Sequence, residues 1–184
     1  MAKISKILAY EIIDSRSFPT IEARMTLDNG REVTTSIPAG TSVGKYELHE
    51  LRDNDPKRFD GMGVLQAVKL IAETLGPKLI GADPLRQKDI DDWLVKANDH
   101  ADRKIGANTI LTISQLVLRA GAVIQDIPLF KYINLLFNDL AKTQLKTQKI
   151  PSPIFNLING GTHANNNLDI QEFQLIPSSG FTFA

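Results

Sequence analysis

Apolar and polar residues roughly alternate along the first 37 residues, which predicts β-strands with one covered face. The alternating stretches are residues 4–13, 20–28 and 31–37. One face of the second stretch carries four apolar side chains: Ile21, Ala23, Met25 and Leu27. Asn29-Gly30, between the second and third stretches, is a strong signal for a tight hairpin turn. The pattern therefore predicts a three-stranded antiparallel meander.

From Gly63 onward, apolar residues recur three or four positions apart, which is typical of amphipathic helices. Four helices are predicted. The first covers residues 64–75 and stops near Gly76-Pro77, and the second starts at Asp83-Pro84. The third follows Gly106-Ala107-Asn108, and the last runs through Leu136. The third is the most apolar, so we expect it at the centre of the core. Trp93, on the apolar face of the second, is also predicted to be core.

Strands followed by helices predict an α+β domain, which we assign to residues 1–137. Residues 138–149 are polar and lack a clear period, so they are predicted to be a linker. Residues 150–184 contain two short apolar runs, 154–158 and 168–176, that predict two more strands. The expected architecture is thus a three-stranded antiparallel meander, about four helices, a linker and two further strands.

Composition narrows the possible partners. Lys and Arg together number 21, as do Asp and Glu, so no overall charge attracts nucleic acid or an anionic membrane. The chain has no cysteine, which excludes disulfide and thiol chemistry. The N-terminus has no signal-peptide pattern, and no apolar run approaches a membrane span. We expect a cytoplasmic protein.

The polar loop between the last two predicted strands carries most of the candidate chemistry. Gly160 and Gly161 allow positive φ and a close approach of the backbone to a ligand, while His163, Gln171 and Glu172 bring an imidazole, an amide and a carboxylate to one loop. Strand alternation places the amide and the carboxylate on opposite faces, so both reach one ligand only near the end of the strand. The alternative is an ordinary hairpin turn with a surface histidine.

A second loop, residues 38–47, contains two glycines and exposed hydroxyl groups. Such a segment is either a plain connection or a mobile loop that closes over a site. The charged side chains that follow, in residues 47–53, are predicted to be surface and interface groups. We assign no catalytic role to His49.

Several separated motifs, in order, give the chain a resemblance to enolase. They are Glu-Ile-Ile-Asp-Ser-Arg-x-x-Pro-Thr-Ile-Glu-Ala at residues 11–23, Leu-Ile-Asn-Gly-Gly-x-His-Ala at 157–164, and Asp-Ile-Gln-Glu-Phe at 169–173. The likeness extends from about Ile4 to Pro177. It implies that the last two strands begin a catalytic TIM-like barrel. It also implies interconversion of 2-phosphoglycerate and phosphoenolpyruvate, with two magnesium ions that stabilise the enediolate.

The resemblance also implies roles for individual residues. His163 would face the substrate phosphate or the leaving group, Gln171 would bind the substrate, and Glu172 would assist the departure of hydroxide. Ser42 corresponds to a lid serine that completes the coordination of the second magnesium ion. A homodimer is the assembly that the family implies.

Two stretches depart from the family pattern. The lid sequence differs at Ala39, Thr41 and Val43, which puts the metal role of Ser42 in doubt. Ser17-Phe18 stands where the family has Gly-Asn, so we expect a reshaped turn there.

The catalytic lysine and the main acidic metal ligands of the family lie later in the barrel, and a complete barrel takes about 250 residues. We therefore predict that this chain alone is inactive. Three explanations are open: the N-terminal part of a longer enolase, a natural short paralogue that acts as a binding or oligomerisation module, or one half of a split enzyme. We also expect a stable body over residues 1–137 and exposed apolar faces on the last two strands.

Overall fold

The structure is a computed structural model that describes residues 2–40, 43–100, 105–146, 150–161, 164–178 and 180. The chain divides into two compact units, Met1–Leu145 and Lys146–Ala184.

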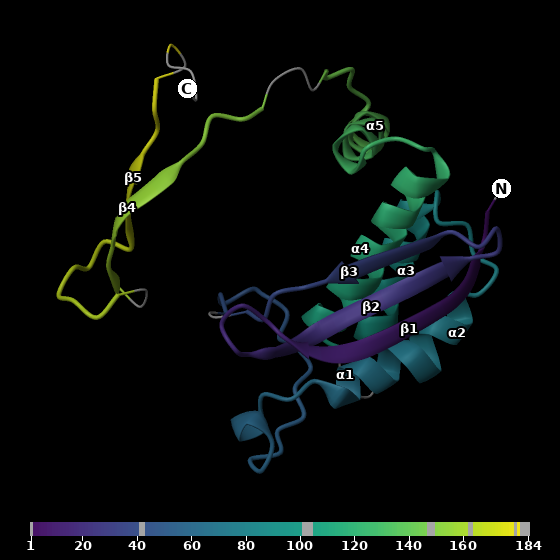
Figure 1. Cartoon of the computed structure of the whole chain (residues 1–184), viewed down its shortest axis with the longest axis horizontal. Helices are drawn as coiled ribbons and strands as arrows, with labels where there is room; N and C mark the ends of the chain where they lie inside the picture. The colour runs from purple at the N-terminus through teal and green to yellow at the C-terminus, as the bar shows by residue number, and fades with distance from the viewer. Residues whose placement is uncertain are drawn as a thin grey trace. The chain divides into compact units, whose positions relative to one another are not determined.

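The first unit contains the predicted meander (Figure 1). Its strands are β1 (Ile4–Ile13), β2 (Pro19–Leu27) and β3 (Glu32–Ser36), antiparallel in the order β1-β2-β3. Gly30 has a φ of 80° and donates its N–H to the Leu27 carbonyl at 3.0 Å, so the Asn-Gly turn forms as predicted. The four apolar side chains assigned to one face of β2 are each at most 1% exposed. The predicted antiparallel meander and the buried face of its second strand are confirmed.

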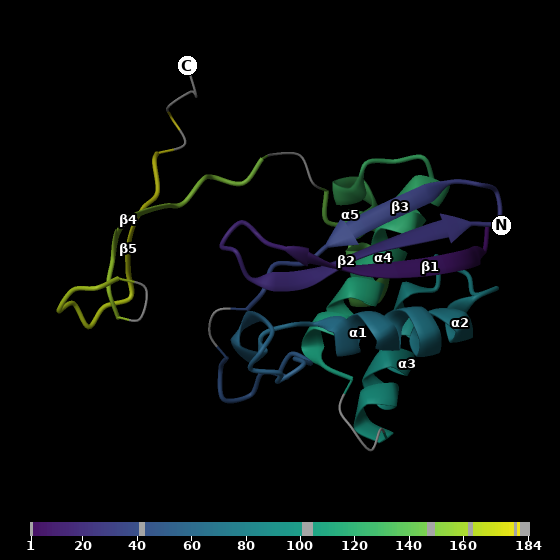
Figure 2. The ribbon, with the colours of Figure 1, turned by 60° about the horizontal axis from the view of Figure 1, so that its bottom comes forward.

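Helices cover one face of this sheet (Figure 2). The helices of this unit are α1 (Leu65–Leu70), a π-helical turn (Ile71–Leu75), α2 (Gly76–Leu79), α3 (Gln87–His100), α4 (Ala107–Ile124) and α5 (Leu129–Ala141). Helices α3 and α5 pack on α4. Helix α4 packs on β2 and β3, while α1, α2 and the π-helical turn pack on β1. Strands and helices share one hydrophobic core, which confirms the α+β fold.

Helix α4 is the predicted central helix. Within the described parts of the chain, it is also the one helix long and apolar enough to cross a membrane by length and composition, and half of its 18 residues are buried inside the structure. Its contacts with two strands and with α3 and α5 account for that composition, because a helix covered on several sides needs apolar residues around most of its surface.

The first predicted helix does not stop at Gly76-Pro77 but continues to Leu79. The wider π-helical turn directly precedes α2, in which Pro77 is the second residue. A Cβ at Gly76 would lie 2.7 Å from the Ile71 carbonyl oxygen and 3.3 Å from the Ile7 Cβ. This glycine therefore serves close packing against β1 and does not end the helix.

Two other helix boundaries differ from the prediction. Helix α3 begins at Gln87, because Asp83 closes a separate turn in which its carboxylate accepts the Leu85 N–H at 3.0 Å. Helix α5 extends to Ala141, so residues 138–141 of the predicted linker are helical. Lys142 ends it with a φ of 53°, the left-handed conformation common after a helix.

The second unit contains an antiparallel hairpin of β4 (Phe155–Asn159) and β5 (Glu172–Leu175). The strand predicted over residues 168–176 starts four residues later, at Glu172. Residues 168–171 instead form a loop, in which the Leu168 and Gln171 carbonyls accept the N–H groups of Gly161 and Gly160. Every residue of both strands is exposed, as expected from the sequence.

Candidate functional site

The hairpin loop of the second unit depends on its two glycines. Gly160 donates its N–H to the Gln171 carbonyl at 2.9 Å, and Gly161 donates to the Leu168 carbonyl at 2.8 Å. A Cβ at Gly160 would lie 2.4 Å from the Ile170 carbonyl oxygen, so only glycine fits there. Gly161 has a φ of 59°, in the left-handed region. The glycines therefore allow a close approach to the chain's own backbone, while the predicted approach to a ligand stays a prediction.

Glu172 is the first residue of β5, and Gln171 immediately precedes it. The Gln174 side chain donates to the Glu172 carboxylate at 2.7 Å and to the side-chain amide oxygen of Asn156 at 2.9 Å. Glu172 and Gln174 thus lie on one face of the strand, as two-residue spacing requires. Glu172 and Gln171 are both exposed. The other two predicted site residues, His163 and Ser42, lie outside the described residues.

Over the described ranges, no three His, Asp or Glu side chains come together closely enough to hold a metal ion. Magnesium prefers several oxygen ligands in near-octahedral geometry. These ranges therefore do not by themselves form a magnesium site, although the family resemblance implies a divalent metal.

A second polar cluster, in the first unit, was not predicted. Asp14, at the turn after β1, accepts the backbone N–H groups of Arg16 and Phe18 at 2.9 Å each and that of Ala39 at 3.3 Å. Arg16 donates to the Ala39 carbonyl at 2.5 Å. The Phe18 N–H is the main cause that lowers the pKa of Asp14 below its ordinary value, and the bonds from Arg16 and Ala39 act in the same direction.

Ser17 in the same turn has a φ of 64°. A serine thus adopts the left-handed conformation that glycine adopts with less strain. The positive φ falls at the position where the family pattern has glycine, and the reshaping of this turn stays a prediction. The turn closes through a hydrogen bond from the Asp14 N–H to the Phe18 carbonyl at 2.8 Å.

The following segment is anchored from its other side by Glu50 and Arg52. The Gly40 N–H donates to the Glu50 carboxylate at 3.0 Å, and the same carboxylate pairs with Arg52. Arg52 also donates to the Pro19 and Met62 carbonyls at 2.7 Å each, and its side chain is 11% exposed. We call Asp14, Arg16, Glu50 and Arg52 the loop anchor.

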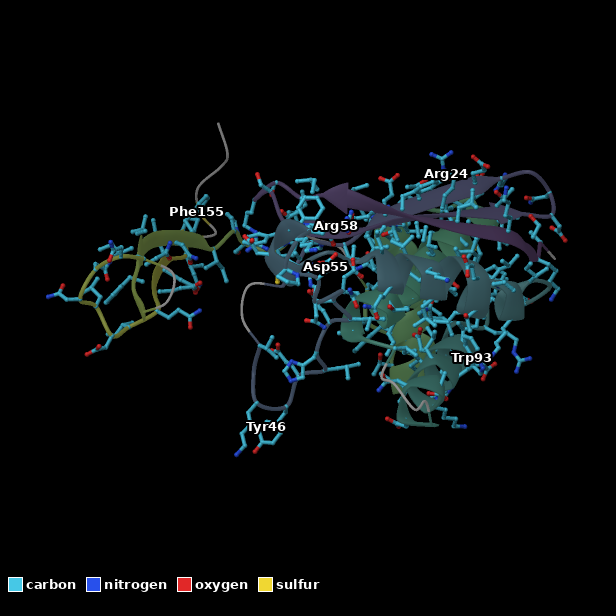
Figure 3. All side chains as sticks on the ribbon, turned by 90° about the horizontal axis from the view of Figure 1, so that it is seen from below. Arg24, Tyr46, Asp55, Arg58, Trp93 and Phe155 are labelled. Carbon is cyan, nitrogen blue, oxygen red and sulfur yellow. The ribbon has the colours of Figure 1, made fainter. Side chains whose placement is uncertain are left out.

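The loop anchor holds Ala39-Gly40, at the start of the predicted lid, while the far part of that loop is exposed. Tyr46 is 92% exposed and lies at the tip of a projecting loop (Figure 3). The prediction that residues 47–53 carry surface and interface groups did not include this anchoring role of Glu50 and Arg52. No local sequence signal reveals this role, because Asp14 and Ala39 are 25 residues apart.

We expect Glu50→Ala to speed tryptic cleavage after Lys45 by roughly 5-fold, because one lost hydrogen bond of about 1 kcal/mol makes loop opening that much more frequent. The measurement is the initial rate of appearance of the fragment that ends at Lys45, followed by mass spectrometry. Glu32→Ala, which removes an exposed carboxylate of β3, is the control. Equal rates in the two variants would contradict the anchoring role.

The chain consists of an α+β domain followed in sequence by a hairpin that carries polar side chains. Sequence models of known families define the class: "Enolase, N-terminal domain" matches residues 4–133, and "Enolase, C-terminal TIM barrel domain" matches residues 147–184. The chain is thus of the class in which an α+β domain precedes a TIM barrel.

Curated relatives give the family. The chain is 43% identical to "Enolase" of Ehrlichia canis (strain Jake) over 182 residues, and 41% identical to "Enolase" of Malacoplasma penetrans (strain HF-2) over 176 residues. These alignments cover 98% and 95% of this chain, and 41% and 38% of the two relatives. The chain belongs to the enolase family. It spans about two fifths of the length of the curated relatives that it matches.

Proposed function

We propose that this chain supplies the N-terminal domain and the first barrel segment of a phosphopyruvate hydratase, the lyase that interconverts 2-phosphoglycerate and phosphoenolpyruvate. The observation that carries the proposal is the ordered match to both enolase domains over nearly the whole chain. The observed meander, central helix and hairpin agree with that assignment.

Within the complete enzyme, we assign substrate contacts to His163, Gln171 and Glu172. The carboxylate of Glu172 is exposed at the start of β5, where it is free of any ion pair among the described residues, so it can accept or donate a proton at a bound ligand. The Gln171 amide, one residue earlier, can donate to a substrate oxygen.

Magnesium is the metal that we propose for the complete enzyme. When bound, it would stabilise the negative charge that develops on the substrate carboxylate. Ser42 is the residue of this chain that we assign to the second ion. The further ligands must come from residues beyond those described, because the described ranges contain no metal-binding cluster.

The test begins with the source DNA, read past the codon for Ala184. If an open frame continues, the extended protein is expected to form phosphoenolpyruvate from 2-phosphoglycerate with magnesium, and the 184-residue chain is expected to form none. Activity of the 184-residue chain would overturn the assignment of the catalytic base and metal ligands to later residues.

In the extended protein, we expect Glu172→Gln to lower kcat by about 100-fold or more, the usual effect of losing a positioned acid or base. The change is nearly isosteric and keeps a hydrogen-bond acceptor for Gln174. Asp169→Asn, a similar neutralisation in the same loop, is the matched control and should retain activity. Equal kcat in the two variants would rule out a catalytic role for Glu172.

A stop codon directly after Ala184 would overturn the proposal. The alternative, a short paralogue that acts as a binding or oligomerisation module, would then apply, and the exposed apolar residues of β4 and β5 would be the surface to examine. A homodimeric assembly and a cytoplasmic location remain predictions.

A further inference from the structure

A cavity of 370 Å³ lies in the first unit, and none of its lining residues belongs to the loop anchor. Its walls come from three segments: the start of the chain at Lys3, the end of α2 with the turn after it, and the first two turns of α3. Its volume falls in the range of about 300–1,000 Å³ that is usual for small-molecule sites. Trp93, on its α3 wall, is well separated from the Tyr46 loop (Figure 3).

The inner wall of the cavity is apolar and includes an aromatic ring. Leu79 and Ile90 are 4% and 6% exposed, and both belong to the hydrophobic core. Trp93 is partly buried and packs against that core while it lines the cavity. A rigidly held indole of this kind is a good surface for a planar ring to stack on.

The rim of the cavity is charged. Lys3 pairs with Asp83 at 3.5 Å, and Arg86 pairs with Asp89 at 2.5 Å. Lys78, at the end of α2, lines the cavity and forms no ion pair within the described part of the chain. Since the other rim charges are paired, the ammonium group of Lys78 is the positive charge left to attract an anion.

From this arrangement we infer that the cavity binds a small ligand with a planar aromatic ring and one anionic group, of the chemical class of a nucleoside monophosphate. The ring stacks on the indole of Trp93, and the phosphate pairs with the ammonium of Lys78. The inference does not depend on the proposed enzymatic activity, because no cavity residue belongs to the hairpin or to the loop anchor.

The chain contains a single tryptophan, so its intrinsic fluorescence reports on this cavity directly. Titration of the 184-residue chain with adenosine monophosphate should quench the fluorescence with a saturable curve. Adenosine, which lacks the charge, should bind at least 10-fold more weakly, and inorganic phosphate should not quench. Equilibrium dialysis of labelled adenosine monophosphate gives a second value of Kd that does not rely on fluorescence.

Lys78→Ala should raise the Kd about 10-fold and leave the thermal midpoint unchanged. Lys96→Ala, on the exposed side of α3 and outside the cavity, is the matched control and should retain the original Kd. Linear quenching, equal affinity for adenosine and its monophosphate, or equal Kd values in the two variants would overturn the inference.

Discussion

Gly121→Ala is expected to lower the free energy of unfolding of the first unit by about 2–3 kcal/mol, through overpacking of the contact between α4 and α5. A Cβ at this position would lie 2.3 Å from both Cζ and Oη of Tyr132. That ring is 2% exposed and cannot swing away into solvent. Alanine would otherwise add up to about 1 kcal/mol of helix propensity, so the steric cost has to exceed that gain.

The measurement is urea unfolding, with a lower midpoint and an unchanged m value as the expected result. The double variant Gly121→Ala/Tyr132→Leu should be less destabilised than the sum of its single changes, because removal of the ring makes room for the methyl group. A Gly121→Ala variant as stable as the parent would show that the two helices adjust at little cost.

Tyr132 supplies a second control at the same contact. Its hydroxyl is buried and has no hydrogen-bond partner among the described residues. Burial is the main cause that raises the pKa of this phenol. Tyr132→Phe should therefore leave stability unchanged or raise it by about 1 kcal/mol, which separates the effect of the hydroxyl from that of the ring.

Glu11→Ala is expected to lower the free energy of unfolding by about 3 kcal/mol, because its carboxylate both pairs with an arginine and accepts a backbone N–H at the start of a helix. Glu11, on β1, accepts the Val64 N–H at 2.7 Å and an Arg58 N–H at 2.9 Å, and its second oxygen also pairs with Arg58. Its side chain is 9% exposed. Removal would leave the cation and the helix N–H group without this partner.

The Glu11 carboxylate also contributes to the N-terminal capping of α1. Val64, at the N-cap position, has no side chain that can cap the helix. Asp53 accepts the N–H groups of Leu65 and Gln66 at 3.0 and 2.8 Å, and Glu11 accepts that of Val64. Two carboxylates from distant segments therefore replace the usual N-cap residue. Urea unfolding of Glu11→Ala measures the loss, with Glu73→Ala, an exposed helix carboxylate, as the control.

The same carboxylate should make stability depend on pH. The hydrogen bond from Arg58 is the main cause that lowers the pKa of Glu11 below 4.5, against the opposing effect of burial. A lowered folded-state pKa means that the stabilisation is complete above the unfolded-state value and is lost as pH falls through the folded-state value. Between pH 5 and the acid transition, Glu11→Ala should lose less stability than the parent. If the free energy of unfolding of the variant and that of the parent fell in parallel as the pH is lowered, the stabilising role of the Glu11 carboxylate would be contradicted.

The strands and the central helix could be predicted from sequence, because each is set by a short-range pattern. Alternation of Ile21, Ala23, Met25 and Leu27 is enough to identify the buried face of β2, and Asn29-Gly30 is enough to identify the turn after it. The hairpin loop was also predicted in part. Gly161 takes the positive φ expected of it, whereas the close approach at Gly160 is to the chain's own carbonyl.

Helix ends were less predictable, since each depends on contacts that the local sequence does not specify. Gly76-Pro77 predicts a stop, but the π-helical turn before it lets the helix continue against β1. Asp83-Pro84 predicts a helix start, but the Asp83 carboxylate closes a turn of its own. At Gly76-Pro77 the packing against β1 outweighs the local preference, whereas at Asp83 a hydrogen bond to Leu85 closes a turn in place of a helix start.

The sequence by itself determined the α+β class, the order of strands and helices, the buried faces and the family resemblance, because hydrophobic period, turn residues and motifs are all local properties. Only the tertiary structure decided which charged residues meet. Glu11 and Arg58 are 47 residues apart, and Asp14 and Ala39 are 25 apart. The same charged side chain can be solvated on a surface or buried against a backbone N–H. Its sequence neighbours do not distinguish the two cases, because the partner comes from another part of the fold.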